Sequence, residues 1–161
     1  MTNAIDIGLN AAVTSIARKV WRLGYDISDD AKYASAPDPE TYYNEITKRQ
    51  RVTIYTGGSE HTIFGEAEIN YDFRAWHEWT HYILRAPFTL AGELAVARRQ
   101  CEDIARLFGN SEQVERWQRL IMAEVYGQAL YFKRHGQFPS NQIAFDRAYV
   151  NNPELALTYC R

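Results

Sequence analysis

Cysteine is scarce in this chain of 161 residues, since Cys101 and Cys160 are the only two and they lie far apart. This spacing excludes a disulfide framework and a CxxC metal clip, and it favours a reducing compartment. No stretch approaches the ~18 apolar residues of a membrane span, and the first residues lack a basic start followed by an apolar run. The sequence therefore predicts a cytoplasmic protein that neither enters a membrane nor is exported.

A strong charge of either sign is also lacking. The formal net charge is -2, the isoelectric point is near 6.1, and lysine and arginine are scattered singly or in pairs. This distribution gives no basis for binding a phosphate backbone, so we expect no nucleic-acid partner. Hydrophobic residues make up 46% of the chain and aromatic residues 14%, which is too rich for a disordered protein. The length predicts one globular domain over residues 1–161.

Most of the chain shows helical periodicity, with apolar residues recurring every three or four positions. In the first segment Leu9, Val13 and Ile16 mark one face, and Gly24 can end the helix. Proline lacks an N–H and restricts the residue before it, so Pro87 separates two later helices. The predicted helices cover residues 6–23, 40–48, 72–85, 89–108 and 111–135, with a shorter one after Asn141.

Residues 51–70 change to a strand-like pattern around Gly57-Gly58. Val52 and Ile54 lie before the glycines, and a strand-like run follows at residues 62–70. β-Branched residues on both sides of a glycine turn indicate a β-hairpin. The predicted fold class is therefore α+β, mostly helical, with a small antiparallel sheet or hairpin before the helix that carries the motif described next.

That helix contains His77-Glu78-Trp79-Thr80-His81, the His-Glu-x-x-His pattern. Residues four apart on a helix lie about 40° apart around the axis and about 6 Å along it, so His77 and His81 present both imidazoles to one point. Glu78 is offset around the helix, where its carboxylate can act as general base toward a zinc-bound water. With this composition the pattern arises by chance in about 0.7% of such chains.

On these residues the segment 51–107 resembles the zincin-like metallopeptidases. The resemblance implies a zinc cofactor, a peptide or protein substrate hydrolysed at an amide bond, and a neighbouring sheet edge that holds the substrate backbone. The second histidine is not followed by the His-x-x-Gly-x-x-His extension, because residues 84–88 read Leu-Arg-Ala-Pro-Phe, so the chain does not resemble a metzincin. The third zinc ligand must come from elsewhere.

Counting residues across the turn at Pro87 favours Glu93 as that third ligand. His81 lies six residues before Pro87 and Glu93 six after it. In two antiparallel helices both would lie about 9 Å from the turn, and the 8–10 Å between paired helices can be bridged by a histidine and a glutamate through a metal. The predicted ligands are therefore His77, His81 and Glu93, a gluzincin-like set.

Other residues compete for each role. Glu93 has the alternative role of a first-turn carboxylate after an N-cap at Thr89. The competing third ligands are Glu102, Glu124, His135 and His61. An electrophile that stabilises an oxyanion has three candidates, among which the sequence does not select: Tyr126, Tyr149 and Arg98.

Two other classes of protein compete with the peptidase. Glu78-x-x-His81 is also the spacing of ferritin-like di-iron bundles, but these need a second copy, and no other Glu-x-x-His occurs in the chain. The alternative that remains is a non-catalytic helical protein-binding domain, in which an aromatic-rich surface contacts a protein partner. The motif helix would then be structural or only bind metal.

Overall fold

The computed structural model describes residues 5–34 and 38–158, which form two compact units. The first unit extends to Phe88 and the second begins at Thr89. Both are built mainly from helices. The prediction of one domain over residues 1–161 stays a prediction.

Two of the three longer helices of the first unit begin within one residue of the predicted positions, whereas the third begins at Ala67 and not at residue 72. The three helices are α1 (Ile7–Val20), α2 (Pro39–Arg49) and α3 (Ala67–Leu84), with a short 3₁₀ turn, η1 (Ala31–Ala34), before α2. Asp6 caps α1 by accepting the N–H of Leu9 at 3.0 Å, and Asp38 caps α2 by accepting the N–H of Thr41 at 2.9 Å. Such side-chain caps satisfy the first N–H groups, which have no partner inside the helix.

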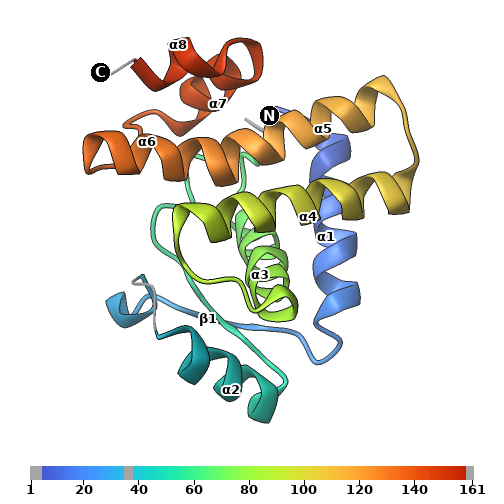
Figure 1. Ribbon diagram of the computed structural model, residues 1–161. Helices are drawn as coiled ribbons and strands as arrows, with labels where there is room; N and C mark the ends of the chain where they lie inside the picture. The colour runs from blue at the N-terminus through green and yellow to red at the C-terminus, as the bar shows by residue number, and fades with distance from the viewer. Residues whose placement is uncertain (1–4, 35–37, 159–161) are drawn as a thin grey trace. The chain divides into compact units, whose positions relative to one another are not determined.

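Helices α1 and α3 lie side by side in the first unit (Figure 1). Polar side chains tie them together at two levels. The hydroxyl of Thr14 donates to Asp72 at 2.7 Å, and at the end of α1 Trp21 donates its indole N–H to the backbone carbonyl of Ala75 at 2.7 Å. The ring of Trp21 also meets that of Trp79 edge-on, with centroids 5.2 Å apart. These contacts fix the rotation of α3 about its axis.

The predicted antiparallel hairpin is wrong. The sheet that the described residues form has two strands, β1 (Asp26–Ser28) and β2 (Thr53–Tyr55), and they are parallel, with Ile27 opposite Ile54. Parallel neighbours need a crossover of a dozen or more residues, usually with a helix, and α2 lies in this one. The chain is mostly helical, and the α+β class with a hairpin before the motif helix is corrected accordingly.

The strand-like run at residues 62–70 forms turns up to Gly65, and α3 begins at Ala67. Its apolar residues do not follow the burial pattern of a strand with one buried face, in which successive side chains point to opposite faces. Ile63 and Phe64 are consecutive, and both are buried. The ring of Phe64 packs on Phe73 of α3, with centroids 4.7 Å apart. Arg74 donates to the carbonyls of Tyr55 and Gly57, which holds the chain where β2 ends. Packing against α3 thus replaces strand pairing.

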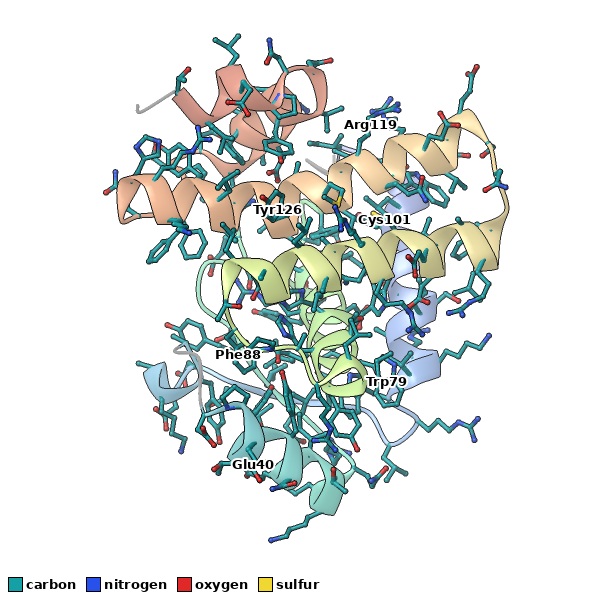
Figure 2. The ribbon with its side chains drawn as sticks, in the orientation of Figure 1. Glu40, Trp79, Phe88, Cys101, Arg119 and Tyr126 are labelled. Carbon is teal, nitrogen blue, oxygen red and sulfur yellow. The ribbon has the colours of Figure 1, made fainter. Side chains whose placement is uncertain are left out.

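The second unit contains only helices among its described residues. They are α4 (Leu90–Phe108), α5 (Glu112–Met122), the π-helical turn η2 (Ala123–Gly127), α6 (Gln128–His135), α7 (Gln142–Asn151) and α8 (Pro153–Thr158). The segment α5–η2–α6 corresponds to the helix predicted at 111–135. Cys101 of α4, labelled in Figure 2, donates its thiol to the carbonyl of Gln118, whose side-chain amide donates back to the carbonyl of Cys101 at 2.9 Å. Cys160 lies outside the described residues.

Glu124 of the π-helical turn forms a carboxyl pair with Asp146, and Asp146 is the buried member. Asp146 of α7 has no exposed surface, and the amide of Gln128 donates to it at 3.2 Å and to Glu124 at 2.8 Å. Burial, followed by the charge of Glu124, raises the pKa of Asp146 well above its usual value. The pair therefore favours one bound proton.

Within residues 5–34 and 38–158, no helix is both long enough and apolar enough to cross a membrane.

Candidate metal centre

The two motif histidines converge on one point, as their spacing predicts. In α3 the Nε2 atoms of His77 and His81 lie 3.1 Å apart, and the two rings are nearly perpendicular, at 75°. Two imidazoles that share a tetrahedral zinc ion at about 2.05 Å have their nitrogens about 3.3 Å apart. The separation in this structure is therefore close to that of two ligands of one ion.

The tautomer of His81 is determined by a backbone carbonyl. Its Nδ1 lies 3.1 Å from the oxygen of Ala86, and His81 has no exposed surface. A carbonyl oxygen only accepts, so Nδ1 carries the proton, and in the neutral ring the lone pair is at Nε2. Metal-binding histidines commonly donate their second ring N–H to a carbonyl or carboxylate in this way. His81 is thus oriented with its metal-binding nitrogen toward His77.

The carbonyl of Ala86 is placed by the way α3 ends. Arg85 has a left-handed backbone conformation, with φ of 51°, and the N–H of Ala86 returns to the carbonyl of His81 at 3.1 Å. This closes the last turn of the helix and brings Ala86 back beside His81. Phe88, labelled in Figure 2, covers the imidazole of His81 with ring centroids 4.7 Å apart.

His77, His81 and Glu93 form a group that could hold a metal ion. Each residue offers one ligand atom, and these atoms lie within 4.8 Å of one another. Glu93 is in the first turn of α4, where its N–H bonds the carbonyl of Thr89 at 2.8 Å and the Thr89 hydroxyl caps the helix. These are the three residues predicted as ligands, and their role as ligands stays a prediction. Two imidazoles and one carboxylate make a donor set that suits zinc and several other divalent ions.

Glu78 is held by a tyrosine that the motif does not predict. The hydroxyl of Tyr42, from α2, donates to Oε2 of Glu78 at 2.9 Å. Burial, followed by the charge of Glu78, raises the pKa of Tyr42 above its usual value. The hydroxyl therefore remains protonated and acts as a donor throughout the neutral range, which holds one oxygen of the Glu78 carboxylate in place.

The four competing third ligands do not belong to the group that the described residues form. Glu102 is exposed on α4, and His61 is exposed in the turn before α3. Glu124 is in η2, beside Gln128 and Asp146. The Nε2 of His135 lies 2.9 Å from the carbonyl of Leu157, a partner inside the second unit.

The three candidate electrophiles all lie in the second unit. Arg98 is exposed on α4. Tyr126, labelled in Figure 2, is half-buried in η2. Tyr149 is half-buried on α7, its ring 5.7 Å from that of Phe145, and burial raises its pKa. Their role at the oxyanion stays a prediction.

Sequence reasoning missed Tyr42 and Tyr43 of α2, which bond Glu78 and the carbonyl of Ala86 respectively. They lie 36 and 43 positions from these partners, and their only signal was the aromatic richness of the chain. No family model, curated protein or solved structure matches the chain, so the resemblance to zincin-like metallopeptidases is carried by the motif alone.

Proposed function

We propose that this protein is a zinc-dependent hydrolase that cleaves an amide bond in a peptide or protein, with His77, His81 and Glu93 as the zinc ligands. The observation that carries the proposal is the convergence of the two Nε2 atoms at 3.1 Å, and the group that the two histidines could form with Glu93 supports it. The hydrogen bond from Nδ1 of His81 to Ala86 supports it, because it leaves the lone pair on the converging nitrogen. The proposed compartment is the reducing cytosol.

A zinc ion held by these three side chains would supply a Lewis acid that polarises a carbonyl and makes a water molecule more acidic. Catalytic zinc sites typically have three protein ligands and an open fourth position, whereas structural zinc sites have four protein ligands. The two imidazoles and the carboxylate suit zinc, but the same set of donors also binds Fe(II). An elemental analysis that distinguishes zinc from iron is therefore needed.

In this proposal Glu78 is the general base. Its carboxylate accepts the proton of the attacking water and returns it to the leaving amine. Tyr42 supports this role because its hydrogen bond to Oε2 restricts the rotation of the carboxylate. The substrate backbone is not expected to pair with residues 62–70, because the described chain forms turns and the start of α3 there and not a strand.

Metal analysis of the purified protein tests the ligands. The chain is analysed as purified by mass spectrometry for zinc and iron, then stripped with a chelator, loaded with zinc, freed of excess metal and analysed again. We expect one zinc per wild-type chain and strong losses in His77→Ala, His81→Ala and Glu93→Ala. Glu102→Ala is the matched control, since it removes an exposed carboxylate from the same helix as Glu93 and should retain the metal. Equal zinc in all variants would overturn the centre.

Hydrolysis is tested separately with the zinc-loaded chain and a quenched fluorescent peptide library. Wild type should cleave members of the library, whereas Glu78→Gln should keep its zinc and lose cleavage by at least 100-fold, the usual contribution of a general base. A wild-type chain that binds zinc and cleaves nothing would overturn the hydrolase and support the non-catalytic binding domain.

A further inference from the structure

The carbonyl oxygen of Ala86 accepts two hydrogen bonds from buried side chains. One comes from Nδ1 of His81 at 3.1 Å, and the other from the hydroxyl of Tyr43. His81 has no exposed surface, and Tyr43 is only 2% exposed. Tyr43 is thus connected to a proposed metal ligand through a single backbone oxygen.

The ring of Tyr43 is held firmly by its neighbours. Its centroid lies 5.7 Å from Tyr42, 6.1 Å from Phe88 and 6.3 Å from Tyr82, and the guanidinium of Arg85 lies over its face at 5.4 Å. These contacts need the ring but not the hydroxyl, since a phenylalanine would pack in the same space. The hydroxyl therefore serves a purpose beyond packing.

We propose that Tyr43 is a positioning residue of the metal centre, which acts on His81 through the carbonyl of Ala86. This inference rests on the proposed zinc centre. The carbonyl belongs to the short connection after α3, and the Tyr43 hydroxyl anchors it to α2. An anchored acceptor keeps the proton on Nδ1 and holds the imidazole plane, so that Nε2 is preorganised for the ion.

The size of the effect follows from the chain of contacts. Loss of a group that directly bonds a metal-binding histidine typically costs 10–100-fold in metal affinity. Tyr43 bonds the carbonyl and not the histidine, so we expect the lower end of this 10–100-fold range. Tyr43→Phe should therefore raise the zinc dissociation constant about 10-fold.

The experiment titrates the full chain with zinc alone, in competition with a chromophoric chelator. Tyr82→Phe is the matched control: it removes a hydroxyl from the same aromatic group, but this hydroxyl pairs with Thr47 at 3.0 Å in an exposed position. We expect weaker zinc binding in Tyr43→Phe and a change of less than about twofold in Tyr82→Phe. Equal affinity of wild type and Tyr43→Phe, or the same loss in both variants, would overturn the inference.

A second readout responds to orientation and not to general stability. Long-range proton–nitrogen spectra of ¹⁵N-histidine report which ring nitrogen of His81 carries the proton in the metal-free chain. Wild type and Tyr82→Phe should show the Nδ1–H form, and Tyr43→Phe a mixture of tautomers. An unchanged tautomer in Tyr43→Phe contradicts the inference even if its stability has fallen. A wild-type chain that binds no zinc overturns the centre itself, and the tautomers then still show whether Tyr43 orients His81.

Discussion

Tyr42 of α2 and Glu78 of α3 are joined by a hydrogen bond of 2.9 Å between the tyrosine hydroxyl and Oε2 of the carboxylate. The bond connects the centre of the His-Glu-x-x-His motif to a helix that the motif does not include. The bond restricts the motions of Glu78, the motif side chain that is proposed to transfer a proton. The two histidines, in contrast, are positioned by the helical spacing of α3 and by the turn that ends it.

The first prediction concerns Tyr42→Phe. Hydrogen bonds to charged groups contribute about 1.5–3 kcal/mol, and only part of this should reach the transition state, so we expect turnover of a cleaved peptide to fall about 10-fold. Zinc content should stay at the wild-type level, because Tyr42 bonds the base and not a ligand. Steady-state kinetics of zinc-loaded enzyme measure this, with Tyr82→Phe as the control. Unchanged turnover would remove Tyr42 from the positioning of Glu78.

Zinc should raise the melting temperature of the chain. A ligand that binds only the folded state at 100 times its dissociation constant stabilises by about 2.7 kcal/mol, which corresponds to roughly 5–10 °C for a chain of this size. Differential scanning calorimetry with and without zinc measures the shift. It should vanish in His81→Ala and persist in His61→Ala, where an exposed histidine is removed. A shift that persists in His81→Ala would place the zinc elsewhere.

Asp146→Asn should stabilise the protein at neutral pH. The pKa of Asp146 is raised in the folded state, so above about pH 4 the unfolded chain loses this proton while the folded chain retains it. The free energy of unfolding contributed by this group therefore falls as pH rises from about 4 toward the folded pKa. An asparagine resembles the protonated carboxyl and does not titrate, so the Asp146→Asn variant does not lose this free energy of unfolding as the pH rises.

Urea unfolding of Asp146→Asn between pH 4 and pH 8 tests this dependence. The free energy of unfolding of the variant should match that of wild type near pH 4 and exceed it near pH 8. The control Asp29→Asn removes an exposed carboxylate and should change this free energy little. A variant less stable than wild type at pH 8 would show that an ionised Asp146 is the favoured form.

Trp21→Phe should destabilise the protein by about 1–2 kcal/mol, through loss of the buried hydrogen bond to Ala75 and of part of the contact with Trp79. Trp117→Phe is a matched comparison, because within the described residues the buried indole N–H of Trp117 has no hydrogen-bond partner. Removing that donor relieves a desolvation cost. Guanidinium unfolding should rank Trp21→Phe as the less stable variant, and the reverse order would contradict the role of the Trp21 bond.

Local features were predictable from sequence because their causes lie within a few residues. The caps at Asp6 and Asp38 bond residues three positions ahead, and His77 and His81 converge because a helix places such positions on one face. The choice of Glu93 as third ligand depends on counting residues across Pro87, and the group that Glu93 could form with His77 and His81 agrees with it. Its role as a ligand stays a prediction.

The hairpin prediction failed for a physical reason. Gly57-Gly58 and the apolar residues after it fit a hairpin, but Phe64 packs on Phe73 and Arg74 takes the carbonyls of Tyr55 and Gly57. The choice between strand pairing and packing on α3 depends on contacts between separate segments of the chain. The strand propensity of a short run of residues does not take such contacts into account, so it could not predict the outcome.

Sequence by itself determined most of the helical segments and the two converging imidazoles, because each depends on backbone geometry repeated over one or two turns. Only the tertiary structure decided that β2 pairs in parallel with β1 and that Tyr42 and Tyr43 reach Glu78 and Ala86. Those contacts join residues 36 and 43 positions apart. They depend on how α2 packs against α3, and that packing is set by the whole buried core of the first unit and not by any local pattern.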